Sequence, residues 1–278
     1  MAVIAMTREM ATLGKDVAAG LAQRLGLTVV HHEVVEHDIA EHAGMRESEV
    51  HRFLEGEASL FERWRIDRNR LSRYTAQEIL ELAAKGNVLI RGWGATYLLR
   101  AVPHVICVRI CAPMLFREQV LMERLGITDR VAAHREIARN DAAHTATMHR
   151  MFGVDGLDTT LYANVLNTAR VPVEACVEQI AHLVRSPAFQ ETAEARRALL
   201  DELILTRVRA ALDQRFGSGV DILGGVDATV SAGKVTLTGA VRKQQVSADA
   251  VRLVQAIEGV TGVENNIVRL PVSSSAWS

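Results

Sequence analysis

Short apolar runs alternate with helical spacing over the first two thirds of the chain. Continuous apolar runs of this kind are typical of strands buried on both faces of a parallel sheet, and we expect strands at residues 3–6, 27–30, 87–90, 104–110 and 161–166. Between the first two runs, apolar residues recur every three to four positions from 15 to 25, as in a helix. Strands that alternate with helices predict an α/β fold with a doubly wound parallel sheet.

A long charged stretch, residues 114–151, also has helical spacing and lies between the last two expected strands. It carries the arginines Arg117, Arg124, Arg130, Arg135, Arg139 and Arg150. On a helix these side chains form either a solvated basic face or, as a set, an arginine-rich helical lid that binds phosphate.

The pattern changes after the expected helix 173–184, where Ser186 and Pro187 end the helical spacing. A polar stretch follows to about Ala195, and the chain of 278 residues is long enough for two domains. The organisation that we expect is a first domain at 1–185, a linker at 186–196, a second domain at 197–271 and a tail at 272–278.

The second expected domain has a pattern of its own. Alternating residues around Gly233 predict a β-hairpin. The segments that we expect there are a helix at 199–216, the hairpin at 229–241, a helix at 246–257 and a strand at 262–270. Together they describe a small α/β module.

Composition narrows the classes of partner. Apolar residues make up 49% of the chain and charged residues 23%, which is ordinary for a globular protein and excludes disordered classes. The formal net charge is −1, so the whole chain has no positive field that would hold nucleic acid or an anionic membrane. We therefore expect neither as a partner, and any basic site must be local.

The cysteines indicate a reducing compartment. Cys107, Cys111 and Cys176 are odd in number and form no CxxC motif, so we expect reduced, mostly buried thiols in a cytoplasmic protein. The short apolar run at residues 2–6 is followed by Arg8 and not by a small-residue cleavage site, so we expect no signal peptide. No apolar run approaches the ~20 residues of a membrane span.

A candidate phosphate loop lies between the first expected strand and helix. Residues 7–16 read Thr-Arg-Glu-Met-Ala-Thr-Leu-Gly-Lys-Asp. Only Gly14 and Lys15 fit a Walker A loop, because Glu9 stands at the first glycine and Asp16 at the hydroxyl residue. An ordinary strand-to-helix turn fits the same residues, although any helix amino terminus attracts an anion.

Residues 1–185 resemble the cytidylate kinase-like family of P-loop proteins. The family's loop, Ser-Arg-Glu-Tyr-Gly-Ser-Gly-Gly-Arg-Glu, coincides with this chain at Arg8, Glu9 and Gly14. Further matches, in order along the chain, are Gly86-Asn87-Val88, Gly92, Gly94-Ala95, Ala112-Pro113, Phe116-Arg117, Asn140-Asp141 and Asn167-Thr168. The resemblance implies a P-loop kinase-like fold with ATP and Mg²⁺ as cofactors.

The resemblance also implies roles for individual residues. The residues that it implies for nucleotide binding are Arg8, Thr12, Gly14, Lys15 and Asp16, and Asp16 would also bind the metal. Those that it implies for catalysis are Lys15, Arg117 and Arg139. Those that it implies for binding the acceptor substrate are His32, Arg91, Trp93, Asp141 and His144.

Several positions depart from the family pattern. Ala11 and Leu13 replace loop glycines, and we expect Leu13 to block a positive φ and to crowd the phosphate oxygens. Trp93, Val120 and His144 each stand where the family has an arginine, although Arg91 lies close to the first of these in sequence. Phosphoryl transfer depends on positioned charge, so these losses predict weak or absent catalysis.

Several histidines crowd into one short stretch: His31, His32, His37, His42 and His51. Helical spacing would place His37 beside Glu41, which is compatible with zinc, but no third ligand has a diagnostic spacing. We therefore interpret them as polar, solvent-facing histidines, although the resemblance would put His32 near the acceptor base or ribose.

Residues 197–271 resemble a BON domain. Gly233, Gly239, Val235, Leu237 and Asn265 are among the positions that match in order and spacing. These are folding residues, so the resemblance implies a module for protein, lipid or small-ligand partners without pointing to a site.

The sequence is compatible with two functions. One is a degenerate kinase-like protein that binds a nucleotide or small phosphorylated ligand with weak or no transfer, joined to a BON interaction module. The other is an active ATP-dependent nucleoside monophosphate kinase with Lys15 on the donor phosphates.

Overall fold

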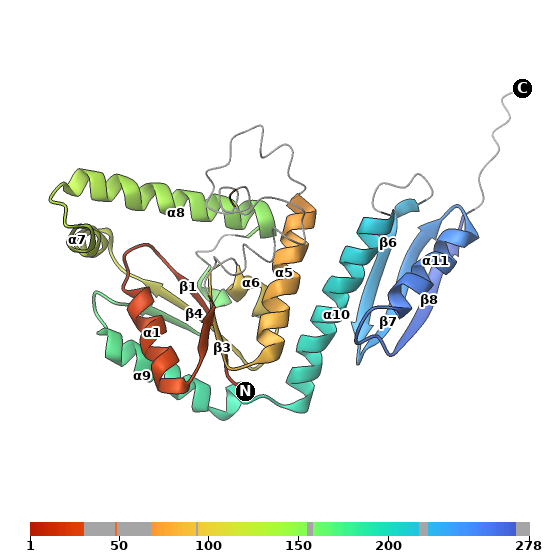
Figure 1. The fold of residues 1–278 in the computed structure, drawn as a ribbon, viewed down its shortest axis with the longest axis horizontal. Coiled ribbons are helices and arrows are strands. Elements are labelled where there is room, and N and C mark those ends of the chain that lie inside the picture. The colour runs from red at the N-terminus through yellow and green to blue at the C-terminus, as the bar shows by residue number, and fades with distance from the viewer. Residues whose placement is uncertain (31–47, 49–67, 93, 155–157, 217–221, 271–278) are drawn as a thin grey trace, which may run out of the picture. The chain divides into compact units, whose positions relative to one another are not determined.

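The computed structural model describes residues 1–30, 48, 68–92, 94–154, 158–216 and 222–270 (Figure 1). The chain divides into two compact units, Met1–Ala195 and Arg196–Ser278. Each unit has a hydrophobic core of its own.

The first unit is built on a five-stranded sheet with β1 at its centre. In spatial order the strands are β2 (Thr28–Val30), β3 (Val88–Arg91), β1 (Val3–Arg8), β4 (Val105–Cys111) and β5 (Asn164–Asn167). All four neighbouring pairs are parallel. The carboxyl ends of the strands therefore meet at one edge of the sheet, which is where ligands bind in folds of this class.

Helices cover both faces of the sheet (Figure 1). On one face α1 (Gly14–Leu25) and α9 (Val173–Arg185) contact each other, and Val17, Leu21 and Ile180 are completely buried against strand residues. On the other face α5 (Arg68–Lys85) contacts β3, and the short α6 (Ala95–Leu99) contacts β1 and β4. The predicted doubly wound arrangement is confirmed.

The charged stretch that we expected as one long helix is two helices, α7 (Met114–Leu125) and α8 (Arg130–Phe152). Gly126 ends α7 in a left-handed conformation with φ of 65°, and the Asp129 carboxylate accepts a hydrogen bond from the Ala132 amide at the start of α8. A glycine C-cap and an aspartate N-cap this close together separate two helices. We refer to them as the α7–α8 hairpin.

The last strand also differs from the expectation. Residues 159–161 form the 3₁₀ helix η1 (Thr159–Leu161), and β5 begins only at Asn164. Because β5 pairs with β4 alone, it is an edge strand: Leu166 is buried, whereas Val165 is 38% exposed. Burial on both faces was therefore the wrong expectation for this strand.

The polar stretch after α9 is part of the first unit and packs against its core. It contains the 3₁₀ helix η2 (Pro187–Phe189), and Phe189 packs against the core of the sheet and helices. The Met1 amino group pairs with the Glu191 carboxylate at 2.9 Å. Helix α10 (Ala193–Phe216) then begins, and the boundary between the units falls after Ala195.

The second unit is a mixed three-stranded sheet with helices. Strands β6 (Ile222–Ser231) and β7 (Lys234–Val241) form the predicted hairpin, and α11 (Gln244–Gln255) leads to β8 (Gly262–Arg269), which pairs parallel to β7. Val208 of α10, Leu237 of β7 and Val254 of α11 are completely buried in its core.

Among the described helices, none combines the length and the apolar character needed to cross a membrane. Cys107 and Cys176 are buried and Cys111 is partly buried, all as free thiols. Burial raises the pKa of the Cys107 thiol to about 12, so it stays protonated.

Candidate functional site

The candidate loop, residues 9–13, joins the carboxyl end of the central strand β1 to α1. Ala11 and Leu13 both have left-handed backbones, with φ of 59° and 57°. The expectation that Leu13 would block a positive φ is therefore wrong. A left-handed conformation costs a non-glycine residue roughly 1–2 kcal/mol, so the loop keeps a glycine-like path at an energetic cost.

Internal hydrogen bonds hold this strained path. The Thr12 hydroxyl, which is buried, donates to the Glu9 carbonyl at 2.8 Å. From the end of β5, the Thr168 hydroxyl donates to the Thr12 carbonyl at 2.7 Å. The surrounding fold thus fixes the loop conformation.

The amino end of α1 follows directly from the loop. Its N-cap residue, Leu13, provides no side-chain hydrogen bond to the helix, and Lys15 and Asp16 are exposed on the first turn. The first amide groups of a helix lack partners within the helix and carry partial positive charge. An uncapped helix start with a lysine on its first turn can therefore bind a phosphate group.

Gly14 is required here for space. A Cβ atom at this position would lie 2.9 Å from both Cβ and Cδ of Arg8. The Arg8 side chain therefore lies against the start of α1, beside the backbone that would face an anion.

An ion-pair network lies beside the loop. The Glu9 carboxylate pairs with Arg109 at 2.5 Å and with Arg117 at 3.4 Å. The side chains of these two arginines are 10% and 5% exposed. Buried charges need partners of this kind, because removing one partner costs several kcal/mol.

Arg117 ties the loop to the α7–α8 hairpin. Its Nε donates to the Met10 carbonyl at 2.7 Å, and its two terminal nitrogens donate to the Asp141 carboxylate of α8 at 2.9 and 2.7 Å. Such a bidentate pair fixes the plane of the guanidinium. The contacts that Arg117 makes are thus with the loop backbone and two carboxylates.

Two of the positions that depart from the family pattern lie in one apolar cluster. Ala11 is buried with Leu121, Ala133 and Ile137 of the hairpin, and Val120 packs against them. Where the resemblance implies a glycine and an arginine, the chain instead has apolar side chains that pack the loop against the hairpin.

His144 lies one turn after Asp141 on α8, partly buried. Burial lowers its pKa, and the nearby Arg109 and Arg8 lower it further, while Asp141 and Glu9 act in the opposite direction. The imidazole is therefore neutral at neutral pH, in contrast to the arginine that the resemblance implies at this position.

The comparisons with known proteins agree with this geometry. The cytidylate kinase-like family matches residues 3–170, which is more than half of the chain and includes the loop, the network and the α7–α8 hairpin. The chain belongs to the cytidylate kinase-like family. The BON domain matches residues 201–271, within the second unit. No curated protein matches the chain.

One solved structure shares its fold with about two thirds of this cytidylate kinase-like chain. An uncharacterized protein from Eubacterium ventriosum ATCC 27560 has a TM-score of 0.52 and 19% identity, and the match covers 66% of this chain and 97% of that one. A shikimate kinase from Bacteroides thetaiotaomicron has a TM-score of 0.41 and 13% identity, covering 66% and 99%. At 19% identity, the likeness to the Eubacterium ventriosum protein concerns the fold alone.

The remaining predicted residues of this family member do not all meet at the loop. Arg91 is buried at the carboxyl end of β3. The Arg139 side chain is 68% exposed and donates to Glu136 one turn earlier on α8, so it belongs to the solvated face that we considered. His32 and Trp93, like the whole histidine stretch, lie outside the described residues.

No group of three His, Cys, Asp or Glu side chains suited to a metal occurs in the described part of the chain. Magnesium does not require such a group, because it is commonly held by one or two carboxylates, waters and substrate phosphates. The exposed carboxylate of Asp16, on the first turn of α1, fits that mode of binding.

Sequence reasoning missed Arg109. Its signal was an arginine inside an otherwise apolar strand, because a charge in a buried strand must have a partner. The sequence showed Glu9 as a departure from Walker A and as a match to the family's loop, without a partner, and the structure makes it the partner of Arg109.

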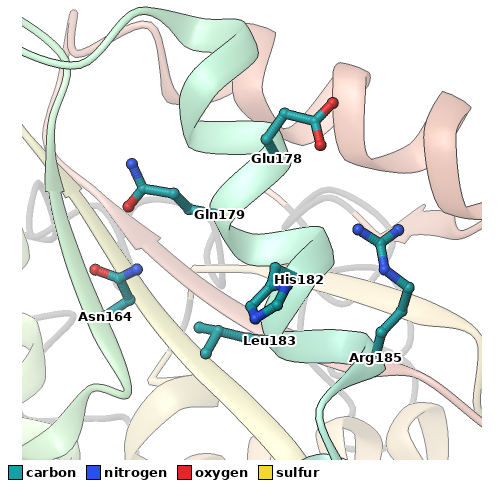
Figure 2. Close-up of a pocket in the computed structure, with 6 residues that line it drawn as sticks. All are labelled: Asn164, Glu178, Gln179, His182, Leu183 and Arg185. Carbon is teal, nitrogen blue, oxygen red and sulfur yellow. The ribbon is translucent and has the colours of Figure 1, made fainter.

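A separate pocket of about 480 Å³ lies between β5 and α9. Figure 2 shows Asn164 and Gln179 on one side of α9, and Glu178 and Arg185 on the other. Glu178 pairs with Arg24 of α1 at 2.7 Å. The pocket shares no residue with the phosphate-loop network.

Proposed function

We propose that the loop at residues 9–13 and the first turn of α1 bind a nucleotide or a small phosphorylated ligand, and that phosphoryl transfer is weak or absent. The observation that carries binding is the uncapped start of α1 behind two left-handed residues, Ala11 and Leu13. Strained backbone of this kind persists where the surrounding fold imposes it, and it clusters at ligand sites. A plain strand-to-helix turn would not require it.

Weak transfer follows from the state of the nearby cations. Arg117 is occupied by Asp141 and Arg109 by Glu9, and His144 is neutral. Phosphoryl transfer requires positive charge directed at the transferring group. Cations already neutralised by carboxylates contribute less to that charge.

ATP with Mg²⁺ is the ligand that we propose first. Lys15 would contact the donor phosphates and Asp16 the metal, since both lie on the exposed first turn of α1. The metal would neutralise phosphate charge, while the loop amides and Lys15 orient the phosphates. The free thiols fit the cytoplasmic location that we propose.

An active nucleoside monophosphate kinase is the second candidate. It is favoured by the loop itself, which keeps its left-handed path although two glycines are absent. Arg8 and Lys15 also remain beside the helix start. Measured turnover separates the two candidates, because both require nucleotide binding.

The BON domain is, in this proposal, the part that contacts a protein or small-ligand partner. Because it is a separate compact unit with its own core, it can contribute an interaction without altering the phosphate loop. Binding by a chain that lacks residues 197–271 would show whether the two roles are separable.

Titration calorimetry with ATP, with and without Mg²⁺, tests the binding proposal. Lys15→Ala is expected to remove donor-phosphate affinity, and Lys85→Ala, an exposed lysine at the end of α5, serves as the matched control. At about 100 times its dissociation constant, ATP should stabilise the wild-type protein by ~2.7 kcal/mol in thermal unfolding. Unchanged ATP binding by a folded Lys15→Ala protein would show that the loop is not the phosphate site.

A further inference from the structure

His144 occupies a face of α8 that is directed at the phosphate loop. Asp141, three residues earlier, shares that face of the helix. The Asp141 carboxylate accepts hydrogen bonds from Arg117, and Arg117 in turn donates to the Met10 carbonyl of the loop. Asp141 on this face is thus connected to the loop through the Arg117 side chain.

Charged groups from several elements surround His144. Those that interact with it directly, or through Asp141, are Arg8 of β1, Glu9 of the loop, Arg109 of β4, Arg117 of α7 and Asp141 of α8. Helix α5 also contacts α8, and there the Ser72 hydroxyl donates to the Met151 carbonyl about two turns further along. Around His144, three guanidiniums therefore face two carboxylates.

The side chains of this cluster differ in whether they form hydrogen bonds with one another. Glu9 bonds Arg109, and Asp141 bonds Arg117. Within the part of the chain that the structure describes, the His144 imidazole makes no hydrogen bond. It is the titratable group of this cluster whose protonation near neutral pH can change without breaking an existing ion pair.

We infer that His144 is a proton-dependent cation of the phosphate site, neutral in the ligand-free protein and protonated when a phosphate dianion lies on the loop. The inference rests on the proposed function. The proton comes from solvent and adds to a ring nitrogen, without any change in covalent bonds. A family member with arginine at this position would carry a permanent charge and show no such dependence.

The direction of the pH effect follows from the charges. Without ligand, burial and the nearby Arg109 and Arg8 guanidiniums oppose a further positive charge, and the pKa of His144 lies below its ordinary value. A bound dianion reverses that balance and raises the pKa. Ligand affinity is then highest at a pH below the ligand-free pKa and falls as pH rises through the pKa of the complex.

The experiment is ATP titration calorimetry between pH 6 and 8, in buffers of low and high ionisation enthalpy. Wild-type protein should take up protons on binding, and affinity should fall with rising pH by about tenfold for each unit by which ATP raises the pKa. His144→Gln should abolish this part of the pH dependence, and His144→Arg should bind ATP without it. His149→Gln, an exposed histidine on the same helix, should behave as wild type.

ATP itself titrates in this range, so the measured quantity is the difference between wild type and His144→Gln. If the glutamine variant does not fold, the arginine variant supplies the comparison, and the imidazole proton resonances of the wild type report its pKa with and without ATP. Binding with identical proton uptake in wild type and both variants would overturn this inference alone. No ATP binding by the wild type at any pH would overturn the proposed function together with it.

Discussion

The phosphate loop of the first unit and the β6–β7 turn of the second both contain left-handed alanines, but they differ in what binds the neighbouring amide groups. Both contain alanine in the left-handed region: Ala11 with φ of 59° and Ala232 with φ of 50°. At the turn, the Asp201 carboxylate of α10 accepts hydrogen bonds from the amides of Ala232 and Gly233, at 2.7 and 2.8 Å. At the loop, the helix start that follows has no side-chain cap.

The difference distinguishes a structural turn from the proposed ligand site. A carboxylate of the same chain satisfies the turn, so its strained residues are compensated within the fold. The start of α1 has no comparable carboxylate from a capping side chain, which is the arrangement expected where a ligand anion takes that place. Left-handed alanines alone therefore do not identify a site; the partner of the neighbouring amides does.

The largest expected effect concerns catalysis at the loop. Cytidylate kinase activity should lie about four orders of magnitude below that of a complete enzyme, because each lost charge contact costs on the order of 3 kcal/mol of transition-state stabilisation. A coupled assay over the common nucleoside monophosphates, with ATP and Mg²⁺, measures it. Turnover near 10 per second, a typical enzyme value, would contradict the degenerate-site interpretation.

Restoring the family residues sharpens this prediction. Leu13→Gly, Trp93→Arg and His144→Arg together should raise the rate, since they return one loop glycine and two cations. The three single variants are the controls. If the combined variant shows no increase while still binding ATP, the site has been misplaced.

The next effect concerns the turn. Asp201→Ala removes two hydrogen bonds to a charged acceptor and should destabilise the second unit by about 2–3 kcal/mol. Denaturant unfolding measures it, with Glu202→Ala, an exposed neighbour on α10, as the control. ATP affinity should not change. A loss comparable to that of Glu202→Ala would mean that the turn does not depend on its carboxylate.

A smaller effect on the free energy of unfolding should differ between the two left-handed residues of the loop, Ala11 and Leu13. Leu13→Gly should stabilise the first unit by about 1 kcal/mol, because glycine adopts this backbone without strain. Ala11→Gly should gain less, since the buried Ala11 methyl packs with Leu121 and Ile137. Thermal unfolding of both variants provides the comparison; equal gains would argue against a packing role for Ala11.

The smallest expected effect is on the independence of the two units. The two units Met1–Ala195 and Arg196–Ser278, produced as separate fragments, should each keep nearly the unfolding midpoint that they have in the intact chain. Calorimetry of the separated fragments checks this. Fragments that unfold on separation would indicate one integrated domain.

Most of the fold could be predicted from periodicity. The apolar runs located the strands, because a central parallel strand needs apolar residues on both faces. The edge strand β5 was misplaced, since an edge position relaxes that requirement and leaves Val165 exposed. The break between α7 and α8 carried a readable signal in Gly126 and Asp129, which helical spacing alone overlooked.

The site was less predictable. Gly14 and Lys15 were proposed as site residues from their order after a strand, but the partners of Glu9 depend on which residues of β4 and α7 the fold places beside the loop. The positive φ at Leu13 could not be predicted, because the intrinsic preference of leucine opposes it and the surrounding contacts overrule that preference.

Gly14 shows which glycine such a loop cannot lose. Ala11 and Leu13 accept a left-handed backbone despite their side chains, whereas Gly14 has no room for even a methyl group beside Arg8. Strain in a dihedral angle can be spread over the hydrogen bonds that hold a loop, but an atom placed 2.9 Å from its neighbour has to move it. Searches for diverged loops of this type should therefore weight the glycine at the helix start above the glycine count, since replacements in mid-loop leave the path of the chain intact.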